Sequence, residues 1–154
     1  MRSIIRCLVA LWLLLSASAF ARDYRFDGLD RPVESRNFRY EDMIYLSGRG
    51  SNQWGQGSSV PNVSRHETKL WFYFLARSYL DAGCEAIHYG QVELMNRNDP
   101  KLDHWAEVLD QARRYAAKSA RRHFLLCDAH VPRGGFVRDD KLLLDVHSFP
   151  LRID

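Results

Sequence analysis

The chain has 154 residues, of which 22 are basic and 19 acidic, and 46% are hydrophobic. This length suits one domain with a substantial core. The arginines are scattered along the chain, so the composition gives no indication of nucleic-acid binding.

The first 21 residues have the pattern of a secretory signal peptide. MRSIIR is basic, CLVALWLLL is apolar, and SASAFA supplies small residues before a cleavage site. We predict cleavage after Ala21 and a secreted or periplasmic product. The apolar run is too short to span a bilayer, so no membrane anchor is expected. Loss of Arg2 and Arg6 leaves 20 basic against 19 acidic residues, a net charge of about +1.

Residues 22–41 are polar and weakly patterned, which predicts an extended lead-in before a single α/β domain over 42–154. The apolar run at 43–46 predicts a short buried strand that ends at Gly48. The following segment, 48–63, is rich in Gly, Ser and Asn and predicts a long loop that exposes Trp54.

A capping box at Ser64 and Glu67 predicts the start of a helix, because the serine and glutamate side chains can each bond the other's backbone amide. Spacings of three and four then predict its buried face, with members Leu70, Trp71, Phe74, Leu75, Tyr79 and Ala82. Gly83 is expected to end the helix in a left-handed conformation.

The remaining elements alternate between strand and helix. Residues 84–95 predict a strand, and Asp99 with Pro100 predicts the start of a helix that runs to about Arg122. A strand over 123–130 follows. The stretch 133–145 is too short for another crossover helix and predicts a hairpin that turns at Asp139 and Asp140.

This order predicts an α/β fold of parallel strands with crossover helices, resembling part of a (β/α) TIM-type barrel, with a C-terminal hairpin. Short apolar strands indicate that both faces of the sheet are covered. A complete barrel needs roughly 200 residues or more. The open edges of a partial barrel would need a second copy of the chain or a partner chain to cover them.

Function collects at the carboxyl ends of parallel strands. Two strands of this chain end in Asp-x-His, at Asp128 with His130 and at Asp145 with His147. Other polar residues are expected at the same edge, namely Arg49, Asn52, Gln53, Trp54, His88, Gln91 and Glu93.

The first functional hypothesis is a carbohydrate-directed hydrolase without a cofactor. Glycoside hydrolysis needs two carboxyl groups that flank the sugar bond, and we predict Glu93 as general acid/base with Asp128 as the second carboxylate. Trp54 would stack on a sugar ring. The expected substrate-binding residues are Arg49, Asn52, Gln53, Trp54, His88, Gln91 and His130.

Two alternatives stay open. A divalent metal ion could be held by Asp-x-His pairs, because both side chains of such a pair lie on one face of a strand; its ligands would be Asp128, His130, Asp145 and His147, with His88 nearby. A less favoured hypothesis for the same residues is that Ser148 acts as a nucleophile beside the Asp128–His130 pair. The other alternative is a non-catalytic module that binds carbohydrate or protein, or a truncated fragment of a barrel.

The cysteines that follow the predicted signal peptide are Cys84 and Cys127. Export permits a disulfide between them, whereas their apolar surroundings favour two free thiols.

Overall fold

The computed structural model describes residues 37–131 and 135–148. The predicted signal peptide over 1–21 lies outside these residues, as does 22–36 of the predicted lead-in. The stretch Tyr40–Asp154 forms one compact unit. Within the described residues, no helix is long and apolar enough to cross a membrane.

The centre of the fold is a sheet of three parallel strands. These strands are β2 (Ala86–His88), β3 (Leu126–Ala129) and β6 (Val146–His147), in the order β2-β3-β6. The chain passes from β2 to β3 through the long helix α4 (Asp103–Ser119). The predicted α/β class with parallel strands and a crossover helix is confirmed, although the described strands do not close into a barrel.

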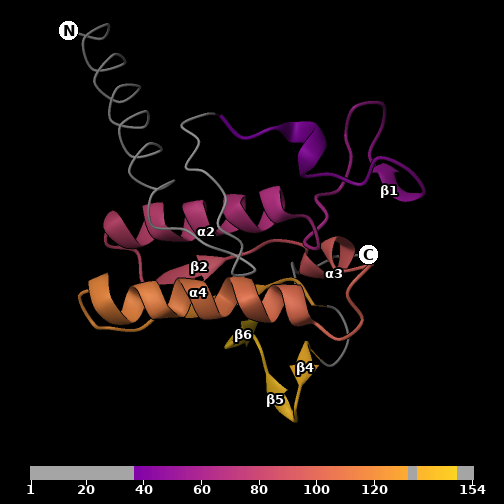
Figure 1. The fold of residues 1–154 in the computed structure, drawn as a ribbon. Coiled ribbons are helices and arrows are strands. Elements are labelled where there is room, and N and C mark those ends of the chain that lie inside the picture. Colours follow the sequence, from indigo (N-terminus) through magenta and orange to yellow (C-terminus); the bar gives the residue numbers. More distant parts are fainter. Residues whose placement is uncertain (1–36, 132–134, 149–154) are drawn as a thin grey trace, which may run out of the picture. The chain divides into compact units, whose positions relative to one another are not determined.

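Two helices cover one face of the sheet. Helix α2 (His66–Asp81) runs beside α4 (Figure 1). Phe72 of α2 lies against Trp105 of α4, with ring centroids 5.0 Å apart. Tyr89, directly after β2, meets both rings from the sheet side. Trp105 is fully buried, so these aromatic rings form the centre of the core.

The other face of the sheet is partly exposed. Strand residues alternate between the two faces, and Ile87 and Cys127 are buried on the helix side. Ala86, His88 and Val146 on the opposite side are exposed. The expectation that both faces of the sheet are covered is therefore wrong for the described strands.

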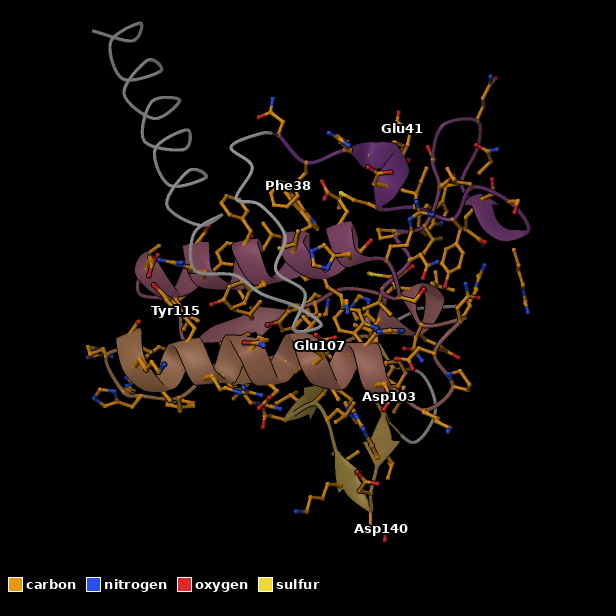
Figure 2. The ribbon with its side chains drawn as sticks, in the orientation of Figure 1. Phe38, Glu41, Asp103, Glu107, Tyr115 and Asp140 are labelled. Atoms are coloured by element: carbon orange, nitrogen blue, oxygen red, sulfur yellow. The ribbon has the colours of Figure 1, made fainter. Side chains whose placement is uncertain are left out.

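The buried face of α2 differs from the predicted one. The residues of the predicted stripe lie at the boundary of the core or in solvent, and Tyr79 is 48% exposed. The buried stripe is shifted along the helix and contains Thr68, Lys69, Phe72, Tyr73, Ala76 and Leu80. The sequence pattern did not reveal this stripe because one of its members, Lys69, is charged. The ammonium group of Lys69 pairs with Glu107 of α4 at 2.7 Å. Figure 2 shows Glu107 between the two helices.

The start of α2 also differs from the predicted capping box. The helix begins one residue later than a serine cap would give, with Arg65 at the cap position and no side-chain cap bond. The Ser64 hydroxyl donates instead to Asn62 Oδ1 at 2.6 Å. The end of the helix is as predicted, because Gly83 has φ +91° and its amide donates to the carbonyl of Leu80.

The predicted first strand is not part of the parallel sheet. Ile44 and Tyr45 are buried as predicted. The segment does not join the sheet, however, and instead pairs with the following loop through an isolated antiparallel bridge between Ile44 and Pro61. A 3-10 helix, η1 (Tyr40–Asp42), precedes it, and a short strand, β1 (Arg49–Asn52), follows it. The predicted long loop after Gly48 therefore folds back on the apolar run that precedes it.

The predicted strand over 84–95 ends early, at His88. Gly90 then turns the chain with φ +77°, and α3 (Val92–Met95) is a short helix. The cap position of α4 is Leu102 rather than Asp99, but the carboxylate of Asp99 accepts hydrogen bonds from the amides of Asp103 and His104 in the first turn. The helix begins at Asp103, so Pro100 does not occupy its first position.

The predicted hairpin is confirmed. Strand β4 (Val137–Arg138) pairs antiparallel with β5 (Lys141–Leu142). Asp139 and Asp140 both have positive φ, which is the conformation of a two-residue hairpin turn. Figure 2 shows Asp140 at the tip of the hairpin and Asp103 at the start of α4. Arg138 pairs with Asp103 at 2.7 Å and ties the hairpin to α4.

Candidate functional site

The strongest cluster of polar side chains lies on the exposed face of the sheet, at its carboxyl edge. His88 ends β2 and lies in register with Asp128 of β3, so both side chains emerge on the same face. Nδ1 of His88 is 2.7 Å from Oδ2 of Asp128. The side chain of His88 is 41% exposed and that of Asp128 is 20% exposed.

Asp128 is held by several donors. Burial raises the pKa of the Asp128 carboxyl, but hydrogen bonds from the Ser148 hydroxyl, His88 and the Ser148 amide outweigh it and lower the pKa below its ordinary value. The carboxyl is therefore ionised near neutral pH. An ionised carboxylate only accepts hydrogen bonds, so Nδ1 of His88 must carry the proton that joins the two groups.

The open ring nitrogen of His88 follows from this tautomer. With the proton on Nδ1, Nε2 of a neutral imidazole carries the lone pair. Among the described residues, none makes a hydrogen bond to Nε2 of His88. The pair thus consists of an orienting carboxylate and an imidazole whose basic nitrogen is accessible.

Ser148 does not have the geometry of a nucleophile activated by histidine. Its hydroxyl donates to Oδ2 of Asp128 at 2.8 Å, and its amide donates to Oδ1 of the same carboxylate at 2.9 Å. The hydroxyl is 3.4 Å from His88, but from Nδ1, the nitrogen already used by Asp128. A serine nucleophile needs the basic nitrogen of its histidine. Ser148 here helps to fix Asp128.

His130 completes the cluster. It follows β3, and its ring lies 4.5 Å from that of His88, centroid to centroid, at an interplanar angle of 59°. The amide of His130 donates to the carbonyl of Gly90, which holds the ends of β2 and β3 together. The prediction that His88, Asp128 and His130 meet at one edge is consistent with these contacts.

The second Asp-x-His pair lies on the opposite face of the sheet. Val146 is in register with Asp128, so Asp145 and His147 alternate away from the exposed face. Asp145 instead pairs with Arg113 of α4 at 2.9 Å and accepts the amide of Cys127 at 2.8 Å. The two similar motifs therefore have different surroundings.

This division bears on the metal-ion alternative. Asp128 and His130 lie on the exposed face, whereas Asp145 and His147 lie on the helix side. The four predicted ligands therefore do not converge on one ion. No group of three or more His, Cys, Asp or Glu side chains placed to hold a metal ion occurs in the part of the chain that the structure describes.

The two other residues predicted after β2 are on α3 rather than on a strand. Gln91 precedes the helix and Glu93 lies in its first turn, and both are exposed. The prediction that they continue the strand of His88 is wrong, because β2 ends at His88 and the chain turns at Gly90. Between the described residues, no hydrogen bond or ion pair joins the side chain of Glu93 to His88 or Asp128.

The loop residues predicted to bind substrate lie together at β1. Arg49, Asn52, Gln53 and Trp54 are all exposed, Trp54 to 60%. The side-chain oxygen of Asn52 bonds within the loop, because Oδ1 accepts a hydrogen bond from the amide of Gly57 at 2.8 Å. Gln53 Oε1 accepts a hydrogen bond from Arg97 at 3.4 Å. Arg97 lies just after α3, so this bond connects the loop to the segment that leaves β2.

The sequence analysis did not predict the contacts of two arginines, Arg113 and Arg97. Arg113 was not among the predicted site residues, but it contacts both Asp145 and the carbonyl of Leu143. Arg97 stood in a turn without any pattern. Arg113 could have been noticed, since it lies one position after the buried Ala112 and so at the margin of the buried stripe. No local signal marks Arg97.

Both cysteines that the structure describes are free. Cys84 is exposed after α2, and Cys127 is fully buried in β3. Burial raises the pKa of the Cys127 thiol to about 11, so it packs as a small apolar side chain beside Tyr89 rather than as a nucleophile.

Comparisons of the chain with protein-family models, with curated proteins and with solved structures give no match.

Proposed function

We propose that the chain is a carbohydrate-directed hydrolase domain in which His88 transfers the proton. The observation that carries this proposal is the His88–Asp128 pair, whose hydrogen bond leaves Nε2 of an accessible imidazole open. Histidine is the side chain most often used to move a proton in enzymes. The pair lies where parallel α/β folds place their reactions, at the carboxyl ends of the strands.

Asp128 has the role of a positioning residue. Protein donors approach both of its oxygens, so it is poorly placed to attack a substrate or to give up a proton. Its carboxylate holds the His88 ring with the proton on Nδ1 while Nε2 takes a proton from water. The earlier assignment of Asp128 as a carboxylate beside the sugar bond is thus replaced by one that acts through His88.

Glu93 is the proposed general acid. When water attacks a glycosidic bond, its proton passes to a base and a second proton must reach the departing oxygen. His88 would take the first proton and Glu93 would supply the second. Glu93 is exposed on α3, the element that follows His88 along the chain.

The choice of carbohydrate is supported by the β1 loop. An exposed tryptophan beside amide side chains suits a sugar, whose ring faces stack on aromatic rings while its hydroxyls bond to amides. The hydroxyl of Tyr45 donates to the carbonyl of Met95 at 3.2 Å, and Arg97 bonds Gln53. These contacts hold the Trp54 loop against the segment after β2.

We further propose that the sheet is a section of a larger (β/α)-type sheet, completed by a second copy or by a partner chain. The face without helices carries His88 and Asp128, and in a (β/α) barrel that face lines the interior. In the described part of the chain, β2 and β6 are paired only with β3.

The test is release of reducing ends from a panel of polysaccharides by the exported protein and by His88→Gln. We expect this variant to lose at least about 100-fold in rate, the usual contribution of a general acid or base. The matched control is His123→Gln, since His123 is exposed at the opposite end of the sheet, before β3.

Each result has a distinct meaning. Equal activity of the two histidine variants would overturn the role of His88. Loss in Glu93→Gln together with His88→Gln supports the two-residue mechanism, whereas an active Glu93→Gln protein removes Glu93 from it. A folded wild-type protein that binds a polysaccharide without hydrolysing it would favour the non-catalytic module.

A further inference from the structure

A hollow lined by arginines lies beside the β1 loop. Its volume is about 760 Å³, and its walls come from the apolar run that precedes β1, from the start of α2 and from the turn after α3. The polar side chains among its lining residues are Ser47, Arg49, Asn62, Arg65, Arg97 and Asn98. None of the described lining side chains is acidic.

The three arginines differ in whether a carboxylate of the protein neutralises their positive charge. Arg65 donates to the carbonyl of Asp42 at 2.7 Å and lies 3.8 Å from its carboxylate. Arg49 is exposed, and no ion pair joins it to another described residue. Arg97 donates to the neutral amide of Gln53 at 3.4 Å, and no ion pair joins it to an acidic side chain among the residues that the structure describes. The hollow therefore contains more positive charge than its surroundings neutralise.

Arg97 has a further unused donor. Its Nη1 atom is buried and has no hydrogen-bond partner. Buried N–H groups are nearly always satisfied in folded proteins, and an exception calls for an explanation. The arginines that line the hollow suit an oxyanion, because the planar fork of a guanidinium matches two oxygens of a carboxylate or sulfate.

The backbone is shaped to bring Arg97 there. Gly50 has φ +113°, and a Cβ atom at this position would come within 3.1 Å of Nη1 of Arg97 and 2.9 Å of the Tyr45 ring. Only glycine permits this close approach without strain. The hydroxyl of Tyr45 is bonded to Met95 in turn, so the floor of the hollow is fixed by contacts from three segments.

We propose that this hollow binds the carboxylate or sulfate group of an acidic saccharide, and that it selects such substrates for the strand-end site. The proposal rests on the carbohydrate-directed function given above. The Trp54 loop adjoins the hollow, because Gln53, next to Trp54, is the residue that Arg97 contacts. Trp54 would stack on one sugar ring while Arg49 and Arg97 hold the anionic group of that ring or the next.

The test is calorimetric binding of three trisaccharides to the full chain, namely a galacturonic acid trimer, a sulfated galactose trimer and neutral galactotriose. We expect at least one of the acidic sugars to bind about tenfold more tightly than the neutral one at low salt, with the preference falling as salt is added. The acidic sugar with the higher affinity identifies the anionic group. Equal binding of all three sugars would overturn the proposal.

Variants separate the arginines from general surface charge. Arg49→Gln and Arg97→Gln are each expected to lose about tenfold in affinity for the acidic sugar. Arg121→Gln, at an exposed residue beside Glu85, serves as the matched control and is expected to bind like wild type. Arg49→Gln removes an exposed side chain, so its result remains interpretable if Arg97→Gln fails to fold. Wild-type affinity in Arg49→Gln would contradict the proposal.

The outcome can be told apart from that of the proposed function. His88→Gln should keep the preference for the acidic over the neutral sugar while losing hydrolysis. An acidic preference in a protein that hydrolyses nothing would refute the hydrolase and leave this binding site standing. Hydrolysis without an acidic preference would support the hydrolase and refute this site.

Discussion

Asp128 is the residue on which the geometry of the site depends most. Its two oxygens accept hydrogen bonds from His88, the Ser148 hydroxyl and the Ser148 amide. Through these bonds one carboxylate orients the imidazole of β2 and attaches the end of β6 to β3. The Asp-x-His pattern predicted where Asp128 and His130 lie, and Ser148 was predicted beside them as a nucleophile, whereas it donates two hydrogen bonds to Asp128. That serine becomes a neighbour only through the pairing of β6 with β3.

Asp128→Asn should lower stability in a manner that depends on pH. Because the folded state lowers the pKa of Asp128, ionisation stabilises the fold at pH values above the ordinary carboxyl pKa of about 3.9, and this stabilisation is lost as pH falls through the folded pKa. We expect the variant to be about 1–2 kcal/mol less stable than wild type at pH 7. The difference should shrink below about pH 4.

Urea unfolding at a series of pH values measures this difference. Ser148→Ala is a suitable comparison, because it removes one donor to Asp128 and keeps the charge. A stability difference for Asp128→Asn that stayed constant from pH 7 to pH 3 would show that the charge of Asp128 is not what stabilises the fold.

At the scale of elements, local patterns predicted α4 and the hairpin well. Trp105, Val108, Leu109 and Ala112 form a clean apolar stripe on α4, and all are buried. On α2 the stripe was misplaced, because aromatic residues occur on several sides of this helix and a lysine belongs to its buried side. A buried lysine can be recognised only when its partner is known, and Glu107 lies on another helix.

The Lys69–Glu107 pair should contribute measurably to the packing of α2 on α4. Lys69 is only 2% exposed and Glu107 27%, so removing the charge of Glu107 leaves a buried ammonium group without this partner. We expect Glu107→Gln to lower the free energy of unfolding by about 2 kcal/mol.

Asp110→Asn is the control for this substitution. It lies on the same helix and pairs with Arg114, but both side chains are more than half exposed, and such pairs contribute at most about 0.5 kcal/mol. Urea unfolding of both variants provides the comparison. Equal losses in the two variants would show that burial does not strengthen the Lys69 pair.

At the scale of the whole molecule, the parallel arrangement was predictable and the exposure of one sheet face was not. Alternation of strands with α4 predicted parallel pairing, which the β2-β3-β6 order confirms. The apolar run at 43–46 looked like another strand of the same sheet, yet it pairs antiparallel with Pro61. The spacing of apolar residues shows which side of a segment is buried. It does not show which other segment covers that side.

Unfolding of the whole chain tests whether the described core is self-sufficient. Helices α2 and α4 and the sheet share the buried Trp105, so we expect one cooperative transition in urea when tryptophan fluorescence is followed. Trp54→Phe removes an exposed fluorophore and should leave the midpoint unchanged. A sloping loss of signal, or a midpoint that rises with protein concentration, would indicate that a second copy or partner completes the sheet.

The most direct test of the account is the protonation of the His88 ring, measured by ¹⁵N NMR at neutral pH in the wild-type chain and in Asp128→Asn. We predict that the neutral ring of His88 carries its proton on Nδ1, bonded to Asp128, with Nε2 unprotonated and open to solvent. This preference should weaken in Asp128→Asn. A wild-type ring with its proton on Nε2, or a tautomer that Asp128→Asn leaves unchanged, would contradict the proposed role of His88 as the base.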